Sequence, residues 1–218
     1  MTTEQAYKQL CYMIREYADA KGDTAEDFIK NPHKYTDWPC FYGAACQFLV
    51  EYMEKMDKST PARVKSALKR ITKSAPSWMT GLLPSDDEKA LICNSVCVLR
   101  LDTAPPSLPR ADNDRARDFG RRLPEMIDQA KAENHTLARK ISPAEVKVYV
   151  LQTGLKGEMA RREPYQVADN YYLRCGLLID MLEALPDADI YLPDKPSQPA
   201  YMIAANGDGI ILPVVIRR

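Results

Sequence analysis

The chain has 218 residues, of which 45% are hydrophobic and 28% are charged, as is usual for a globular protein with a buried core. Its 30 lysines and arginines balance its 30 aspartates and glutamates, so no global field attracts a nucleic acid or a membrane, and such a partner would need a local patch. No apolar run reaches the roughly 18 residues of a membrane span, and residues 1–5 do not resemble a signal peptide, so we expect a cytoplasmic protein with no membrane partner.

The first predicted part is a small helical N-terminal subdomain over residues 1–58. An apolar stripe predicts a helix over 3–20, and Thr24 with the acids after it predicts a short second helix. A third helix is expected over 41–56, and segment 35–52 is rich in aromatic residues. Two interpretations of these aromatics stay open: they seal the core of the subdomain, or they form a patch that binds a partner.

Residues 61–75 predict a basic helix. Pro61 suits its first turn, and apolar residues recur on one face at helical spacing. The other faces carry five basic residues, Arg63, Lys65, Lys69, Arg70 and Lys73. No acid occurs between residues 57 and 86, and such local segregation is typical of a surface that contacts the phosphates of duplex DNA. The alternative is a solvated face that pairs with acids from elsewhere in the chain.

The middle of the chain predicts short strands over 79–104, with a long apolar strand or hairpin over 90–101. Segment 104–109 holds three prolines and reads as a linker. A charged helical zone follows over 112–133, interrupted at Gly120 and Pro124, and its arginines are expected to pair with neighbouring aspartates. Alternating valines predict a strand over 146–151, and a further short strand is expected over 164–168.

The C-terminal stretch predicts a helix followed by three strands. Residues 177–185 read Leu-Leu-Ile-Asp-Met-Leu-Glu-Ala-Leu, apolar on one helical face, and Pro186 ends the helix. Strands are expected over 188–192 and 199–204. Asn206-Gly207-Asp208-Gly209 is a strong turn signal, because these residues tolerate positive φ, and a buried strand over 210–216 closes the chain.

This stretch resembles the end of the bacterial DNA polymerase sliding clamp (beta subunit) family. In that family the last domain ends with a helix of the form Tyr-Leu-Leu-Asp-x-Leu-x-Ala-Leu, and three strands follow. Here Asp180 and Leu182 stand at matching helix positions, and 212–214 corresponds to the terminal strand. The resemblance extends over 113–218 and, more weakly, over 62–104, and it implies duplex DNA and a short hydrophobic peptide of a replication protein as partners. The residues that would border the peptide groove are Leu178, Leu212, Pro213 and Val214. The alternative is that these four are sheet core.

Catalytic signatures are absent from the sequence. The chain has two histidines, His33 and His135, and no glycine-rich phosphate loop or metalloprotease motif. The six cysteines are expected to be reduced and buried. Cys93 and Cys97 are expected on one face of a strand, which is poor geometry for zinc. We therefore expect no enzyme, no cofactor and no metal.

These observations predict an α+β protein, with the helical subdomain followed by a clamp-like region over 59–218 and a sub-boundary at 104–109. The sheet of this region is expected to be antiparallel, with helices on one face. The expected function is a non-enzymatic, DNA-associated, sliding-clamp-like protein, a phage or mobile-element replication accessory that could form a homo-oligomer. One rival is a protein-interaction or regulatory module with a clamp-like fold and no DNA binding. Another is an enzyme of unrecognised type, which an exposed cysteine of low pKa would favour.

Overall fold

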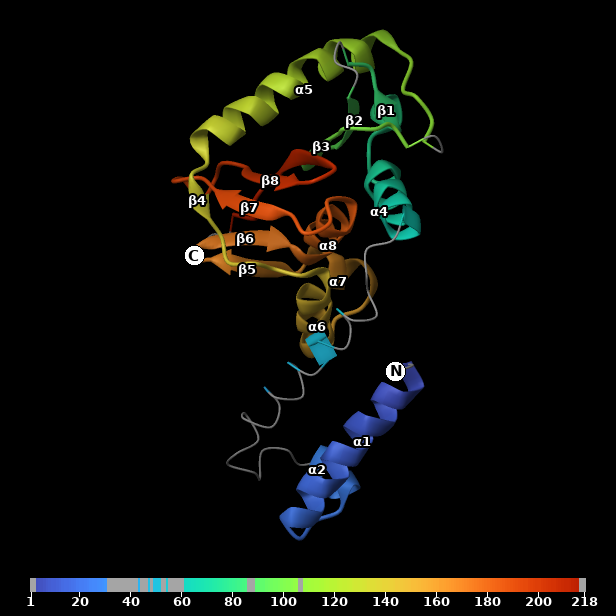
Figure 1. Cartoon of the computed structure of the whole chain (residues 1–218), viewed down its shortest axis with the longest axis vertical. Helices are drawn as coiled ribbons and strands as arrows, with labels where there is room; N and C mark the ends of the chain where they lie inside the picture. The colour runs from blue at the N-terminus through green and yellow to red at the C-terminus, as the bar shows by residue number, and fades with distance from the viewer. Residues whose placement is uncertain are drawn as a thin grey trace. The chain divides into compact units, whose positions relative to one another are not determined.

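The computed structural model describes residues 3–30, 43, 47, 49–51, 54, 61–85, 89–105 and 108–215 (Figure 1). The chain forms two compact units, Met1–Asp57 and Lys58–Arg218. Most of the predicted helix over 41–56 and of the aromatic segment 35–52 lies outside the described residues, so the two interpretations of the aromatics stay predictions.

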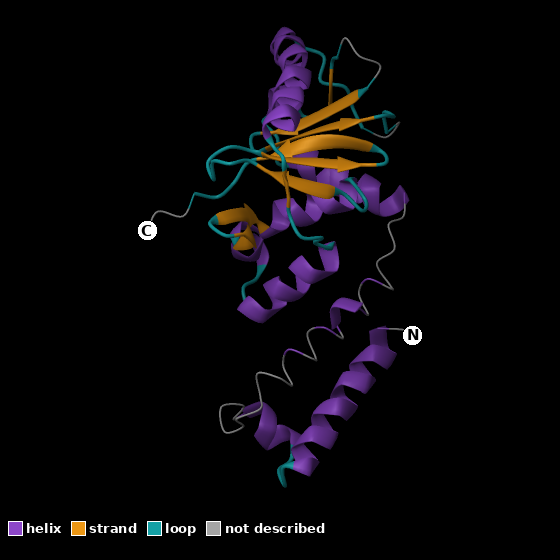
Figure 2. Cartoon of the chain, turned by 60° about the vertical axis from the view of Figure 1, so that its left-hand side comes forward, coloured by secondary structure: helices purple, strands orange, loops and turns teal. Residues whose placement is uncertain are grey.

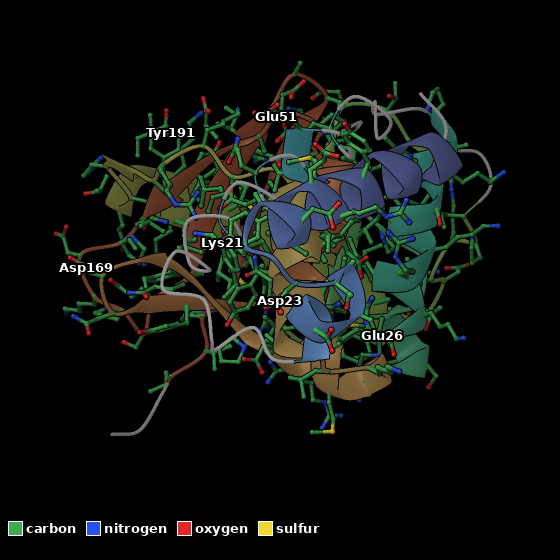
Figure 3. The ribbon with its side chains drawn as sticks, turned by 90° about the horizontal axis from the view of Figure 1, so that it is seen from below. Lys21, Asp23, Glu26, Glu51, Asp169 and Tyr191 are labelled. Carbon is green, nitrogen blue, oxygen red and sulfur yellow. The ribbon has the colours of Figure 1, made fainter. Side chains whose placement is uncertain are left out.

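The described part of the first unit contains α1 (Thr3–Ala20) and α2 (Ala25–Lys30), as the sequence predicts. Gly22 connects them with a φ of 78°, in the left-handed region that glycine adopts easily. Thr24 caps α2, because its hydroxyl oxygen accepts the backbone N–H of Asp27 at 3.1 Å. Lys21, Asp23 and Glu26 place charged side chains around this connection (Figure 3).

The second unit is built on a seven-stranded sheet in the order β1-β2-β3-β9-β8-β7-β4, in which every neighbouring pair is antiparallel. Strands from both sides of the proline-rich segment 104–109 join this one sheet, so the segment connects parts of a single unit. The strands are β1 (Leu82–Leu83), β2 (Ala90–Asn94), β3 (Cys97–Leu101), β4 (Thr136–Leu137), β7 (Asp189–Leu192), β8 (Ala200–Ala204) and β9 (Gly207–Ile211).

A helix followed by three strands occurs twice in this unit. The first copy is α4 (Pro61–Lys73) with β1, β2 and β3, and the second is α8 (Cys175–Ala184) with β7, β8 and β9. The sheet order runs outward from β3 and β9, which pair at its centre, through the middle strands to β1 and β7. The two copies are thus arranged head to head around the β3–β9 pair, and their helices α4 and α8 pack against each other.

Helices cover both faces of the sheet (Figure 2), where the sequence led us to expect helices on one face only. Alternate residues of β2 show why: Ile92 packs with α4 and α8, whereas Leu91 packs with the long helix α5 (Asp114–Glu133). All five residues of β2 and all five of β3 are buried. A strand that is apolar on both sides needs a layer on each side, as in other sheets with two covered faces.

Helix α5 runs through Gly120 and Pro124 without a break, so the predicted interruption is wrong. Its side-chain cap is Asn113, whose Oδ1 accepts the backbone N–H of Ala116 at 2.9 Å. Gly120 lets the helix approach β1, since a Cβ at this position would lie 2.1 Å from the carbonyl oxygen of Pro84. The burial of Leu123 and Ile127 against the sheet holds the helix together across the proline.

The predicted strand over 146–151 is wrong, because these residues lie in α6 (Pro143–Thr153). Ser142 caps the helix, Pro143 occupies its first turn, and Gly154 ends it with a φ of 69°. These start and stop signals outweigh the alternating valines that suggested a strand. Helix α7 (Gly157–Arg162) and the hairpin of β5 (Pro164–Ala168) and β6 (Tyr171–Arg174) follow, with Asp169 at the hairpin turn (Figure 3).

The C-terminal helix and two of its three strands are confirmed as α8, β7 and β8, but the last strand is shifted. The turn lies at 205–206, so Gly207, Asp208 and Gly209 belong to β9, which ends at Ile211. Gly207 sits in the strand with its Cα against the carbonyl oxygen of Arg100, where an added Cβ would lie at 2.3 Å. Residues 212–215 therefore form an extended tail after the strand and not a strand of their own.

Candidate nucleic-acid interface

Helix α4 separates its apolar and basic residues as the sequence predicts. Ala67, Leu68 and Ile71 are almost wholly buried against α8 and the sheet, and Val64 packs beside them. These positions recur at intervals of three and four residues, so they form one stripe along the helix. The opposite side of α4 therefore faces away from the core of its unit.

Three lysines share this outward side. Lys65, Lys69 and Lys73 are exposed and follow one another four residues apart. At about 1.5 Å of rise per residue, the row extends over about 12 Å. Among the residues that the structure describes, no acid forms a salt bridge with any of the three. The row is thus a set of hydrated positive charges, and a phosphate could approach them without displacing a carboxylate.

Arg70 and Arg63 lie differently from the lysines. Arg63 is half-buried and already interacts within the chain. Arg70 turns toward α8, where its Nε donates to Asp180 Oδ1 at 2.6 Å and its Nη2 donates to Glu183. Burial acts to lower the pKa of Arg70, but the hydrogen bonds and charges of Asp180 and Glu183 outweigh this effect and raise the pKa. Of the five predicted contacts, the structure therefore leaves the three lysines available.

Asp180 is the centre of an ion-pair cluster that joins four helices. The residue is 1% exposed, and its second oxygen accepts from Arg161 of α7 at 2.5 Å. Glu183, one turn further along α8, pairs with Lys147 of α6 at 2.7 Å as well as with Arg70. A buried carboxylate is tolerated when strong donors satisfy it, so α4, α6 and α7 are each tied to α8 by charge. The sequence signal for this cluster was an acid in the middle of an otherwise apolar helix.

The arginines of α5 are mostly engaged. Arg117 pairs with Asp112 and with Asp114, at 2.5 Å and 3.2 Å, which confirms the predicted pairing with neighbouring aspartates. Arg115 lies over the ring of Trp78, 4.2 Å from its centroid. This side of the sheet therefore offers a mixed surface, less suited to a polyanion than the lysine row of α4.

The four residues predicted to border a peptide groove do not lie together. Leu178 is fully buried in the core beneath α4, so it cannot line a surface groove in this conformation. Leu212 is 41% exposed, and the backbone N–H groups of Leu212 and Val214 donate to Val96 and Tyr172. Leu212, Pro213 and Val214 thus belong to the tail that bridges the large sheet and the β5–β6 hairpin.

The described cysteines have the character of buried structural thiols. Burial raises the pKa of Cys93 to about 12 and that of Cys175 to about 11, and it also raises the pKa of Cys97 well above its usual value. Cys93 and Cys97 face opposite sides of the sheet, because a turn separates β2 from β3, so the expectation that they share one face is wrong. Within the described part of the chain, no group of three or more potential ligands (His, Cys, Asp, Glu) could hold a metal ion.

Comparisons with protein-family models, with curated proteins and with solved structures found no match to this chain. The chain is an α+β protein whose second unit has an antiparallel sheet between layers of helices, and α4 carries a row of three lysines that no described acid pairs. In the described ranges, no helix is both long enough and apolar enough to cross a bilayer.

Proposed function

We propose that this chain is a non-enzymatic, DNA-associated protein of sliding-clamp type, which contacts the phosphates of duplex DNA through Lys65, Lys69 and Lys73. The observation that carries the proposal is the row of three exposed lysines without acidic partners among the described residues. In a chain of zero net charge, such a row is where a polyanion would be attracted.

The arrangement of the second unit supports the clamp-type part of the proposal. The resemblance predicts a helix followed by three strands near the C-terminus, and the chain has this arrangement there and once more from α4 onward. The basic helix is therefore the counterpart, in the first copy, of the helix that carries the resemblance. In sliding clamps, helices of this basic character line the channel that holds DNA.

The number of lysines sets how steeply binding depends on salt. Each neutralised phosphate contributes a slope of about −0.9 in log K against log salt, so three contacts predict about −2.7. Between about 50 mM and about 200 mM salt, the affinity should then fall about 40-fold. Contacts from other basic residues would make the slope steeper, and a smaller slope would mean that fewer lysines take part.

The test is an anisotropy titration of a short labelled duplex at both salt concentrations. The variant Lys65→Glu/Lys69→Glu/Lys73→Glu should abolish binding. Its matched control is Lys131→Glu/Lys156→Glu/Lys195→Glu, which changes the formal charge by the same amount at three exposed lysines outside α4. If both variants lose the same amount of DNA affinity, only the net charge of the protein matters. If the first variant still binds the duplex, α4 does not contact DNA.

A second candidate function is a protein-interaction module that binds no DNA. The observation in its favour is that Leu151 of α6 and Met159 of α7 are each 67% exposed, so two consecutive helices each present a large apolar side chain to the solvent. Under this alternative, the wild-type chain shows no affinity for the duplex at low salt, and Leu151→Ser/Met159→Ser weakens capture of its protein partner.

A further inference from the structure

A cavity of about 480 Å³ lies at the β1 edge of the sheet, and none of the described residues that line it belongs to α4. Strands β1 and β2 and the residues around Arg110 and Ala111 line it, and Arg117 contributes from the first turns of α5, which approaches β1 at this end (Figure 1). Its volume is in the range of pockets that hold small organic molecules. Nothing in the proposed function uses it.

The floor of this cavity is apolar and well fixed. Leu82, Leu83, Ala90 and Ala111 are all buried. Both backbone groups of Leu82 are occupied: its N–H donates to Pro109, and its carbonyl oxygen accepts from Ala111, each at 2.8 Å. The segment that carries Arg110 is therefore held beside β1 like an additional short strand, with a parallel bridge between Leu82 and Arg110.

The rim of the cavity is cationic. Among the described residues that line it, Lys89, Arg110 and Arg117 are basic and Asp112 is acidic. Lys89 lies 3.3 Å from Asp102, and Arg117 is paired with Asp112. Arg110 is exposed, and its side chain forms no ion pair or hydrogen bond with the described residues. A guanidinium that no described group pairs, next to a buried apolar floor, suits a ligand that brings one negative charge and an apolar portion.

We propose that this cavity binds a small organic anion, with a carboxylate or phosphate group on Arg110 and an apolar portion against Leu83 and Ala111, which pack on the same face of the sheet. The apolar floor alone would bind any apolar molecule of suitable size. The positive charge of Arg110 at the rim makes an anionic ligand preferred. Arg110 provides two parallel N–H donors for the anion, a geometry that fits both carboxylate and phosphate oxygens. Lys89 is paired with Asp102, and Arg117 is paired with Asp112 and Asp114, so Arg110 is the main source of attraction for the anion.

The experiment is an NMR titration of the full chain with labelled alanine methyl groups, using hexanoate, hexyl phosphate, 1-hexanol and inorganic phosphate as probes. The methyls of Ala90, Ala104 and Ala111 line the cavity, whereas Ala160 of α7 serves as an internal reference. We expect hexanoate or hexyl phosphate to shift the three lining methyls, and the uncharged alcohol and inorganic phosphate to bind at least about tenfold more weakly. The stronger of the two anions identifies the charged group that the site prefers.

The variant Arg110→Ala should lower the affinity for the tighter-binding anion about tenfold or more and leave the weak binding of 1-hexanol unchanged. The matched control is Arg122→Ala, an exposed arginine of α5 outside the cavity, which should keep full affinity. Equal affinities of alcohol and anion, unchanged anion binding in Arg110→Ala, or no shift of the lining methyls would overturn the proposal. Duplex DNA binding should be the same in Arg110→Ala and wild type, so this site and the lysine row are tested separately.

Discussion

Replacing Asp180 with asparagine should destabilise the second unit by about 2 kcal/mol. The carboxylate is 1% exposed and accepts from Arg70 and Arg161 at 2.6 Å and 2.5 Å. Two charge-assisted hydrogen bonds of this kind contribute about 1.5–3 kcal/mol each. The two arginines are 35% and 44% exposed, so water can partly replace the carboxylate, and this reduces the sum to about 2 kcal/mol.

The assay is thermal unfolding of the wild type and of Asp180→Asn, followed by circular dichroism. For a unit of this size, a loss of about 2 kcal/mol corresponds to a fall in Tm of about 4–8 °C. The control is Asp114→Asn, in which the same change is made to a carboxylate that is 95% exposed and paired only at the surface. Its Tm should move by about 1 °C at most. If Asp180→Asn moves Tm no more than the control, the cluster does not hold the four helices together.

Three further predictions follow from single contacts. Arg70→Gln should lower the free energy of unfolding by about 1–2 kcal/mol yet weaken duplex binding less than Lys69→Gln, and the reverse order in an anisotropy assay would place Arg70 in the interface. Cys93, Cys97 and Cys175 should react slowly with iodoacetamide near neutral pH, because burial raises their pKa; mass spectrometry showing rapid labelling of any of them would contradict this. Gly120→Ala should cost about 1–3 kcal/mol in urea unfolding, since the new methyl would meet Pro84, and an unchanged midpoint would refute the close packing.

The sequence correctly predicts a helix where the spacing of its apolar residues and the residues at its ends both indicate a helix. In α4 a proline start coincides with an apolar stripe, and in α8 Pro186 follows a run that is apolar on one face. In α6 the two kinds of signal conflict: the valines alternate as in a strand, while Ser142 and Gly154 mark the ends of a helix. The boundaries decide here: Val146 and Val150, four residues apart on one helical face, pack in the core that contains α8, whereas Val148 lies outside that cluster.

The shift of the last strand has a different cause. The turn signal around Asn206 and Gly207 was identified correctly, but its four residues could place the hairpin in more than one register. Pairing across the sheet settles the register, since Gly207 and Gly209 lie where the backbone of β3 leaves no room for a side chain. Such a constraint comes from a strand more than a hundred positions earlier in the chain, so no local pattern around 206–209 contains it.

For helix α4, counting charged residues in the sequence predicts a positive surface but not which of its basic residues remain exposed. The sequence gives α4 five basic residues and no acid, which correctly indicates a positive surface. It does not indicate that α8 brings Asp180 and Glu183 to Arg70, because those acids are more than a hundred residues away. The folded helix therefore presents a narrower positive row than its composition suggests. Because each phosphate contact adds about −0.9 to the salt slope, a slope near −2.7 would support the lysine row alone, and a slope near −4.5 would mean that all five residues contact DNA.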